Sequence, residues 1–258
     1  HHPRETTRPP SAYRARQADS RAQGIAVSTK LAGRVAAVTG GGGGIGAAIA
    51  HAFANAGAAV AILDLDREAA EQVVAEIRDN GGQVQAWQMD VTDRATVEHA
   101  ATEIENRLGP LDIWVNNAGI SRVVPFLACT DEIWERTLKI NLTGAFIGCQ
   151  VAIGRMLPRR RGVVLNMSSQ SGKVGNSHYA AYCASKFGII GLTQSLALEF
   201  AREGIRVNAL YPGVVFTRLW DEQMADYARK RNLQPEEVRP YLEARNPMGR
   251  LCTPEDVA

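Results

Sequence analysis

Val38-Thr39-Gly40-Gly41-Gly42-Gly43-Gly44-Ile45-Gly46 is the segment around which this chain is organised. It ends a short apolar run and begins an amphipathic one, so it predicts a turn from a β-strand into a helix. Glycines let the backbone turn tightly and approach a pyrophosphate, whose charge is then met by the amides and the dipole of the helix N-terminus. Because five consecutive glycines satisfy G-x-G-x-x-G almost by default, at Gly41, Gly43 and Gly46, a plain flexible turn stays open on this segment alone.

Short aliphatic runs alternate with longer amphipathic ones from Leu31 onward, which is typical of βαβ units and a parallel sheet. Several aliphatic runs are apolar throughout, as expected where helices cover both sheet faces. Right-handed crossovers then predict a doubly wound α/β sheet with a ligand crevice at the carboxyl ends of the strands. The predicted strands are Arg34–Thr39, Ala59–Asp64, Val84–Met89, Ile113–Asn116, Val163–Met167 and Val207–Tyr211. The predicted helices are Ile45–Asn55, Arg67–Asn80, Arg94–Leu108, Asp131–Leu157 and Tyr182–Glu203.

The composition fits one domain and narrows the partners. A chain of 258 residues, 45% hydrophobic and 22% charged, is long enough for one large α/β domain with a buried core. The net charge of +2 is too small to indicate nucleic acid or an anionic membrane as the main partner. No apolar run approaches the roughly 20 residues of a membrane span, so we expect a soluble protein. The scattered cysteines fit a reducing cytoplasm and no metal site: Cys129, Cys149, Cys183 and Cys252.

The two ends differ from the middle of the chain. Residues 1–30 are rich in Arg, Pro, Ser and Ala and predict a disordered basic tail, with the catalytic domain at residues 31–258. An organelle transit peptide is the alternative, which the prolines and the missing amphipathic face disfavour. Because the first methionine is Met89 and the last residues begin a helix, we expect a chain trimmed at both ends. Residues 213–247 predict one or two short helices over the crevice, a lid in which substrate choice would lie.

Asp64 ends the second predicted strand, about twenty residues after the glycine turn. A carboxylate there can bind the ribose hydroxyls of adenosine and would repel a 2′-phosphate. No Arg or Lys lies in the glycine segment, and the basic residue nearest in sequence is Arg67, so NAD is predicted over NADP. A helix cap is the alternative role for Asp64, and for Asp66 it is the better one. The strand ends at Asp90-Val91 and at 116–119 fit adenosine and sheet contacts, although each alone is more often an ordinary turn.

Tyr182 and Lys186 lie four residues apart at the start of a predicted helix, so their side chains share one face. An ammonium near a phenol favours the phenolate and lowers the tyrosine pKa from its usual value of about 10. Such a tyrosine can donate or accept a proton at a carbonyl or carbinol oxygen. The pair therefore predicts a site of proton transfer.

Together these segments resemble the short-chain dehydrogenase/reductase family, whose pattern is T-G-x-x-x-G-x-G, N-N-A-G, Ser, Y-x-x-x-K and P-G. The resemblance covers Leu31 to Ala258 and implies a single-domain Rossmann fold whose usual C-terminal strand is missing from this sequence. It implies that Tyr182 is the catalytic acid/base and that Lys186 lowers its pKa and holds the nicotinamide ribose. It further implies that Ser169 binds the substrate oxygen and that Asn141 anchors a water linking Lys186 to solvent. The predicted cofactor-binding residues are Thr39, Gly40, Gly44, Ile45, Gly46, Asp64, Asp90, Val91, Asn117, Ala118, Gly119, Tyr182, Lys186, Pro212, Gly213 and Thr217.

Four neighbours of these residues have competing roles. Tyr179 is too far from Lys186 to share its helix face and either packs or lines the crevice. Ser168 should point away from Ser169, because successive strand residues face opposite sides. His178 allows a proton-relay role, although a loop histidine contacting substrate or solvent is preferred. Cys183 has no base beside it and is expected to pack.

Within the family, residues 171–198 are most similar to polyol dehydrogenases of the sorbitol-6-phosphate type. This implies NAD-dependent interconversion of a secondary alcohol and a ketone on a polyol or sugar alcohol, including its phosphate ester. A sugar phosphate requires basic lid residues such as Arg229, Lys230 or Arg231 toward the crevice, whereas an acyl chain requires an apolar slot. The alternatives are a 3-oxoacyl-carrier-protein reductase, a diol dehydrogenase, and a non-enzymatic nucleotide-sensing scaffold; sugar-nucleotide epimerases are disfavoured by the glycine spacing. The family usually forms homotetramers through the helices predicted here at 131–157 and 182–203.

Overall fold

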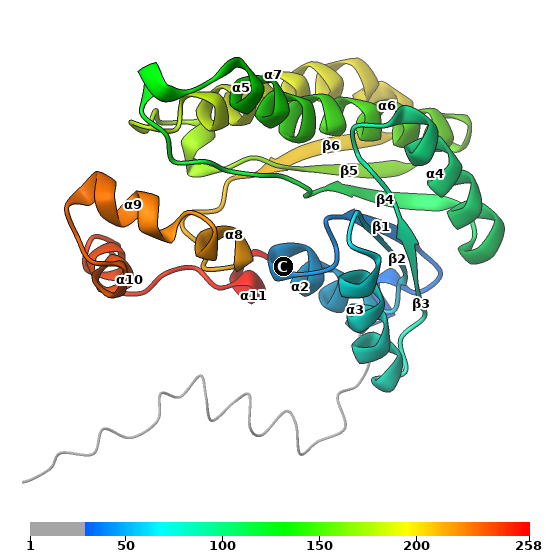
Figure 1. Cartoon of the computed structure of the whole chain (residues 1–258). Coiled ribbons are helices and arrows are strands. Elements are labelled where there is room, and N and C mark those ends of the chain that lie inside the picture. The colour runs from blue at the N-terminus through cyan, green and yellow to red at the C-terminus, as the bar shows by residue number, and fades with distance from the viewer. Residues whose placement is uncertain (1–28) are drawn as a thin grey trace, which may run out of the picture.

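The computed structural model describes residues 29–258 and contains one six-stranded parallel sheet (Figure 1). The strands are β1 (Val35–Thr39), β2 (Ala59–Asp64), β3 (Val84–Gln88), β4 (Leu111–Asn116), β5 (Gly162–Met167) and β6 (Ile205–Leu210). Their order is β3-β2-β1-β4-β5-β6, so the chain reverses its direction of winding between β1 and β4. A ligand crevice forms at such a reversal, because the loops that follow β1 and β4 leave the sheet in opposite directions. The predicted doubly wound α/β fold is confirmed.

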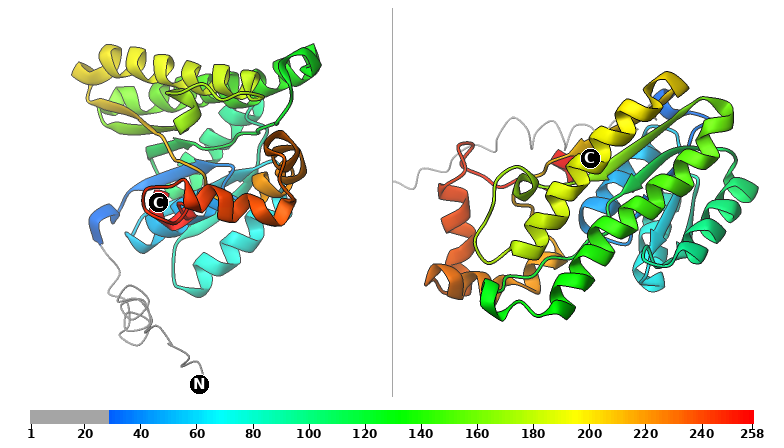
Figure 2. Two further views of the ribbon diagram at one scale, coloured as in Figure 1. Left: turned by 90° about the vertical axis from the view of Figure 1, so that its left-hand side faces the viewer. Right: turned by 90° about the horizontal axis from the view of Figure 1, so that it is seen from above.

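Helices cover both faces of this sheet (Figures 1 and 2). They are α2 (Gly44–Asn55), α3 (Arg67–Asp79), α4 (Arg94–Leu108), α5 (Asp131–Leu138), α6 (Gly144–Met156), α7 (Ala180–Phe200) and α11 (Pro254–Val257). Side chains alternate along each strand: Val35 and Ala37 of β1 pack with α4, α6 and α7, whereas Ala36 and Val38 pack with α2 and α3. This double burial explains why the strands are almost wholly apolar in sequence.

One long helical segment runs from Asp131 to Arg159 across α5, a π-helical turn η3 (Lys139–Thr143), α6 and a short 3-10 turn η4 (Leu157–Arg159). The prediction of a single helix at 131–157 missed the π turn, which has no signal in hydrophobic spacing. By length and composition alone this segment is apolar enough to cross a membrane, with a mean hydropathy of 1.3. That corrects the expectation that no segment reaches this length. More than half of its apolar window is buried inside the protein, as in a core helix.

The segment after β6, residues 213–247, which we call the lid, forms three helices rather than the predicted one or two, and its role as a lid stays a prediction. It contains α8 (Arg218–Asp221), α9 (Met224–Arg231) and α10 (Pro235–Ala244), which lie to one side of the sheet in Figure 1. The lid has its own small core around Trp220, Tyr227 and Val238, and this core reaches the main domain at Tyr179. The chain then returns to the sheet, where α11 contacts α2.

The predicted tail, residues 1–30, lies outside the described residues except for its last two. Thr29–Leu31 form a 3-10 turn, η1, and the Leu31 amide donates a hydrogen bond to the Ala56 carbonyl over 2.8 Å. The domain boundary at residue 31 stays a prediction.

Candidate active site

The glycine turn between β1 and α2 is shaped by close backbone contacts. Gly40 and Gly44 have φ angles of +62° and +53°, which L side chains rarely adopt. A Cβ on Gly46 would lie 2.0 Å from the Gly40 carbonyl oxygen, whereas one on Gly43 would meet nothing within 4 Å. These positions explain the glycine register that the resemblance predicted. The resulting turn brings backbone amides to the start of α2, a cradle that suits a pyrophosphate.

Thr39 and Asn117 tie the end of β1 to the loop after β4. The Thr39 hydroxyl oxygen accepts hydrogen bonds from the amides of Asn117 and Ala118, over 3.0 and 3.1 Å. In return, the Asn117 side-chain amide donates to the carbonyls of Thr39 and Gly40. Thr39 is buried and positions the glycine turn from behind. Asn116, one residue earlier, is buried in the sheet and donates to the Asn166 side chain over 2.8 Å.

Asp64 meets the glycine turn directly. One carboxylate oxygen accepts from the Gly42 amide over 2.8 Å, and the other accepts from the Asp66 amide over 3.0 Å. Asp66 caps α3 by accepting from the Ala69 amide, as predicted. Arg218 was not predicted to lie near this site, because it is far away in the chain, yet its guanidinium lies 3.8 Å from the Asp66 carboxylate. A cation therefore lies closer to this end of the crevice than the sequence spacing suggested.

A cavity of about 520 Å³ extends from the glycine turn to the lid. Most predicted site residues line it: Gly40, Gly44, Ile45, Asp64, Asn117, Ala118, Gly119, Ser169, Tyr182, Lys186, Pro212, Gly213 and Thr217. Three predicted residues do not line the cavity: Thr39, Gly46 and Asn141. They contact residues near it, as described for Thr39 above and for Asn141 below.

Asp90 and Val91 also lie outside the lining of this cavity. The Asp90 carboxylate accepts from the Thr92 amide over 2.8 Å, and Val91 packs so closely on Gly144 that a Cβ there would lie 2.9 Å from it. Their role as cofactor contacts stays a prediction.

Lys186 is buried beneath Tyr182, one helical turn along α7. Its ammonium donates to the Met167 carbonyl at the end of β5 over 2.8 Å and lies 5.6 Å from the centroid of the Tyr182 ring. Burial lowers the pKa of Lys186 to about 8, because the charged form loses its hydration. The two side chains share one face of α7, as the spacing predicted.

Burial raises the pKa of the Tyr182 phenol, and a hydrogen bond with the Ser169 side chain lowers it by less. The net shift of the Tyr182 pKa is therefore upward, opposite to the expected direction, and the role of Lys186 in lowering this pKa stays a prediction. The physical reason for the upward shift is that desolvation disfavours the phenolate, while the Lys186 ammonium is directed to the Met167 carbonyl.

The two serines after β5 point to different partners, as strand alternation predicted. Ser169 caps the turn η5 (Gln170–Gly172) by accepting from the Ser171 amide over 3.1 Å, and it also hydrogen-bonds Tyr182. The Ser168 hydroxyl donates to the Lys186 carbonyl over 2.9 Å. Ser169 therefore faces the crevice beside the phenol, whereas Ser168 fastens α7 to the sheet.

Asn141 lies in the π turn η3 and is almost fully buried. Its side chain accepts from the Ile120 amide over 2.8 Å and donates to the Ile120 carbonyl over 2.9 Å and to the Ser185 hydroxyl over 3.1 Å. A Cβ on Gly119 would lie 3.2 Å from the Asn141 oxygen and 3.6 Å from the Lys186 nitrogen. Asn141 and Lys186 thus border the same glycine, and π turns recur at such functional positions.

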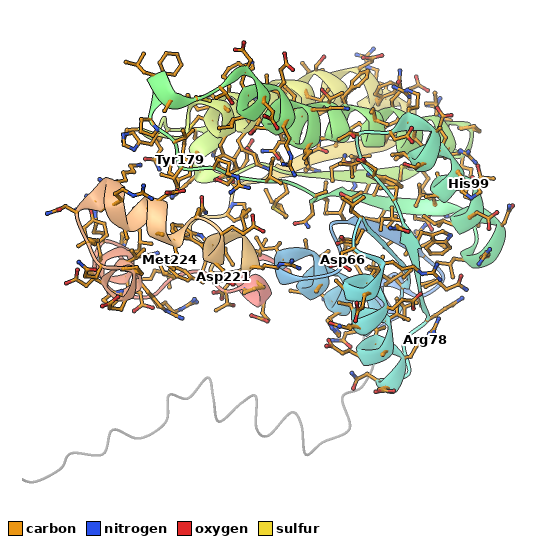
Figure 3. The ribbon with its side chains drawn as sticks, viewed as in Figure 1. Asp66, Arg78, His99, Tyr179, Asp221 and Met224 are labelled. Carbon is orange, nitrogen blue, oxygen red and sulfur yellow. The ribbon has the colours of Figure 1, made fainter. Side chains whose placement is uncertain are left out.

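The other candidates near Tyr182 are structural. Tyr179 is buried in the lid core, with its ring 6.1 Å from that of Tyr182, and also lines the cavity, so both proposed roles apply. Figure 3 places it at the edge of the main domain that faces Met224 of the lid. His178 has a φ of +64° and its carbonyl accepts from the Val124 amide, but it is outside the cavity lining. Cys183 packs against the lid core, as expected.

The lid supplies cavity residues that sequence reasoning did not identify. Gln223 is buried and accepts from the Ser121 hydroxyl over 3.2 Å. The helical part of the lid adds six further residues to the lining, of which only Arg231 was predicted: Trp220, Tyr227, Arg231, Tyr241, Leu242 and Arg245. No motif marks these positions, because the lid helices are short and lack a regular period.

The fold and this site define the class of protein: an oxidoreductase that uses a nicotinamide cofactor. The glycine cradle, Asp64 and the loop at 117–119 fit a dinucleotide. The buried Ser169 and Lys186 and the half-buried Tyr182 line the same cavity, where they can meet the reacting end of such a cofactor. Among residues 29–258, no group of three or more His, Cys, Asp or Glu side chains is arranged to hold a metal ion.

Comparison with known proteins identifies the family. The family model described as short chain dehydrogenase matches residues 34–228, and this chain belongs to that family, whose members act on CH–OH groups. A D-threitol dehydrogenase of Mycolicibacterium smegmatis is 38% identical over 233 residues, covering 89% of this chain and 84% of that protein. A sorbitol dehydrogenase of Cereibacter sphaeroides is 39% identical and covers 88% of each. The crystal structure of an actinorhodin polyketide ketoreductase with NADPH superposes with a TM-score of 0.85 at 34% identity, covering 89% of this chain and 88% of that one.

Proposed function

We propose that this protein catalyses the reversible, NAD-linked oxidation of a secondary alcohol on a polyol or sugar alcohol. The observation that carries the proposal is the polar lining of the crevice beside Tyr182. Beside apolar side chains such as Trp220 and Leu242, the lining there contains eight that carry hydroxyl, amide or guanidinium groups: Ser121, Asn176, Tyr179, Gln223, Tyr227, Arg231, Tyr241 and Arg245. A polyol presents several hydroxyls that need such partners, because a buried polar group without a hydrogen bond is costly.

In the proposed mechanism, Ser169 holds the carbinol oxygen and Tyr182 removes its proton. A bound nicotinamide would supply the acceptor for the hydride that leaves the carbinol carbon. Lys186 holds the nicotinamide ribose and supplies positive charge beneath the phenol, and Asn141 positions a water on the proton path to solvent. The hydrogen bond between Ser169 and Tyr182 and the shared border of Asn141 and Lys186 at Gly119 support these roles.

The choice of NAD rests on Asp64. Its carboxylate accepts from the Gly42 amide at the point where the ribose of adenosine would lie, and a 2′-phosphate there would meet like charge. Arg218 is the opposing feature, because it lines the same crevice and could receive a phosphate. Its guanidinium is already close to the Asp66 carboxylate, which supports NAD as the preferred cofactor.

We also propose a cytoplasmic homotetramer. The helices α5, α6 and α7 expose large apolar side chains, at Trp134 (38%), Phe146 (44%), Phe187 (46%) and Leu198 (84%). Exposed apolar groups on neighbouring helices are typical of a surface covered by another subunit. The cysteines in the described structure are all free, which suits a reducing compartment.

A ketoreductase acting on acyl thioesters is the second candidate, favoured by the structural similarity to the polyketide ketoreductase. The deciding experiment measures turnover of the full chain with NAD and a panel of polyols, in parallel with NADPH and acetoacetyl thioesters. We expect NAD-dependent oxidation of at least one polyol. Activity confined to NADPH and thioesters would reject the polyol proposal and support the ketoreductase.

A further inference from the structure

Two arginines of the lid, Arg231 and Arg245, lie on the rim of the crevice and are available to a ligand. Both line the cavity, and both stack on the ring of Tyr241, at 5.9 and 5.3 Å from its centroid. Arg231 also hydrogen-bonds the Tyr227 hydroxyl and lies 5.7 Å from that ring. The aromatic contacts hold the guanidinium groups beside the tyrosine rings and leave most of their N–H donors without an acceptor among the described residues.

The neighbouring basic residues of the lid are already paired. Arg229 forms an ion pair with Asp226, and Arg239 pairs with Glu243 over 3.0 Å. Lys230 donates to the Asn176 side chain and the Ser177 carbonyl. Within residues 29–258, by contrast, no carboxylate lies within 4.0 Å of the guanidinium group of Arg231 or Arg245. Among the lid cations that line the cavity, Arg231 and Arg245 therefore have no carboxylate partner within residues 29–258, whereas Arg218 lies near Asp66.

The charge along the cavity is divided between its ends. The carboxylates in its lining, Asp64 and Asp66, lie at the glycine turn, where the adenosine would bind. Among the described residues that line the cavity, none at the lid end carries a carboxylate. An anionic ligand group would thus meet arginines without carboxylate partners at the lid end, whereas at the opposite end it would meet two carboxylates and Arg218, which lies near Asp66. This difference favours one orientation of the ligand.

The distance of Arg231 and Arg245 from Tyr182 determines how long a ligand must be to reach all three residues. A series of contacts leads outward from the phenol of Tyr182, whose ring neighbours that of Tyr179. Lys230 lies over the rings of Tyr179 and Tyr227. Arg231 in turn lies near the rings of Tyr227 and Tyr241. Several side chains therefore separate Tyr182 from the arginines. A molecule that reaches both must be extended, with its anionic group at the end remote from the reacting carbinol.

We infer that the substrate is a linear polyol ending in an anionic group, a phosphate or a carboxylate, which Arg231 and Arg245 bind at the rim of the crevice. This rests on the proposed function and names its substrate class. Guanidinium groups suit such ligands because they present paired donors to two oxygens at once.

The test compares three substrates with NAD: D-sorbitol, D-sorbitol 6-phosphate and D-gluconate. We expect kcat/KM for at least one anionic substrate to exceed that for sorbitol by about tenfold, mainly through KM. In R231Q/R245Q the preference should disappear, and in the parent it should weaken as salt is raised. The matched control, R229Q, removes an arginine paired with Asp226 and should keep the preference. The phosphate and carboxylate arms distinguish the two anions.

Equal kcat/KM for neutral and anionic substrates in the parent, or an unchanged preference in R231Q/R245Q, would overturn the inference. If no polyol is oxidised at all, the proposed function fails, but the anion site is still tested by titrating sorbitol 6-phosphate and gluconate into the NADH-loaded protein by calorimetry. Binding that is lost in R231Q/R245Q and kept in R229Q supports the site, and absence of binding in the parent rejects it.

Discussion

The Lys186 ammonium donates a hydrogen bond to the Met167 carbonyl over 2.8 Å, which joins the catalytic helix α7 to the carboxyl end of β5. This contact fixes the depth of the lysine beneath Tyr182. Because the ammonium is buried, its pKa falls to about 8, and the phenol above it keeps its proton more firmly than an exposed tyrosine would. Burial is therefore the main cause of the pKa shifts of both Lys186 and Tyr182.

The stability of the protein should rise between about pH 8 and pH 10. In this range the unfolded chain keeps a proton on Lys186 that the folded chain has lost, so the free energy of unfolding increases with pH, by at most about 1.4 kcal/mol per pH unit for one group. Below pH 8 both states are protonated and this contribution is constant. Burial lowers the pKa of Lys230 to about 8 as well, which adds to the rise.

Above about pH 10 the trend should reverse, because the raised pKa values of Tyr179 and Tyr182 keep these phenols protonated in the folded state while the unfolded ones ionise. Chemical denaturation at each pH measures the effect. Lys186→Met should flatten the rise, and Lys173→Met, at an exposed lysine over the Tyr211 ring, should not. An identical slope in Lys186→Met and the parent would contradict the assignment.

Tyr182→Phe should reduce kcat by about 10²–10⁴-fold, because it removes the group that transfers the proton. Affinity for NADH, measured by fluorescence titration, should be largely retained, since the ring still packs above Lys186. Tyr179→Phe is the matched control: its hydroxyl reaches only the Gln223 side chain, at 3.5 Å, so the loss of turnover should be much smaller. Equal losses in the two variants would remove Tyr182 from its role.

Asp64→Ala should lower the ratio of kcat/KM for NAD over NADP by at least about tenfold, since the charge that opposes a 2′-phosphate is gone. Asp66→Ala removes the cap of α3 and should cost about 0.5–2 kcal/mol of stability; because it also releases Arg218, it should lower that ratio as well, but by less than Asp64→Ala does. Steady-state kinetics with both cofactors and thermal unfolding of both variants separate the two effects. A parent enzyme that prefers NADP would refute the argument from Asp64.

Gly46→Ala should destabilise the protein by about 1–3 kcal/mol and weaken cofactor binding, because the new methyl would lie 2.0 Å from the Gly40 carbonyl oxygen. Gly43→Ala places its methyl where nothing lies within 4 Å and should change stability far less. Thermal unfolding of the two variants tests this contrast. Similar midpoints would mean that the turn relaxes more readily than its close contacts indicate.

The sequence determined the sheet and predicted the residues that we propose carry the chemistry. Apolar runs of strand length, separated by helices, can bury both sheet faces in only a few ways, so the doubly wound order followed from pattern and chirality. The glycines, Asp64 and the Tyr182–Lys186 spacing could be found because each depends on neighbours close in the chain. The long helix from Asp131 to Arg159 was also predicted, but its π turn was not, since it depends on how Asn141 bonds to Ile120 across the site.

Only the tertiary structure decided the electrostatics of the site and the character of the lid. The Tyr182 pKa was expected to fall from the sequence spacing alone, yet desolvation raises it, and burial is a property of the whole packed domain. In the same way Arg218 approaches Asp66, and Arg231 and Arg245 flank Tyr241, because short irregular helices fold back over the crevice. Contacts between segments that are distant in the chain produce no periodic pattern in the sequence. The arrangement of the arginines around the crevice could therefore be seen only in the folded structure.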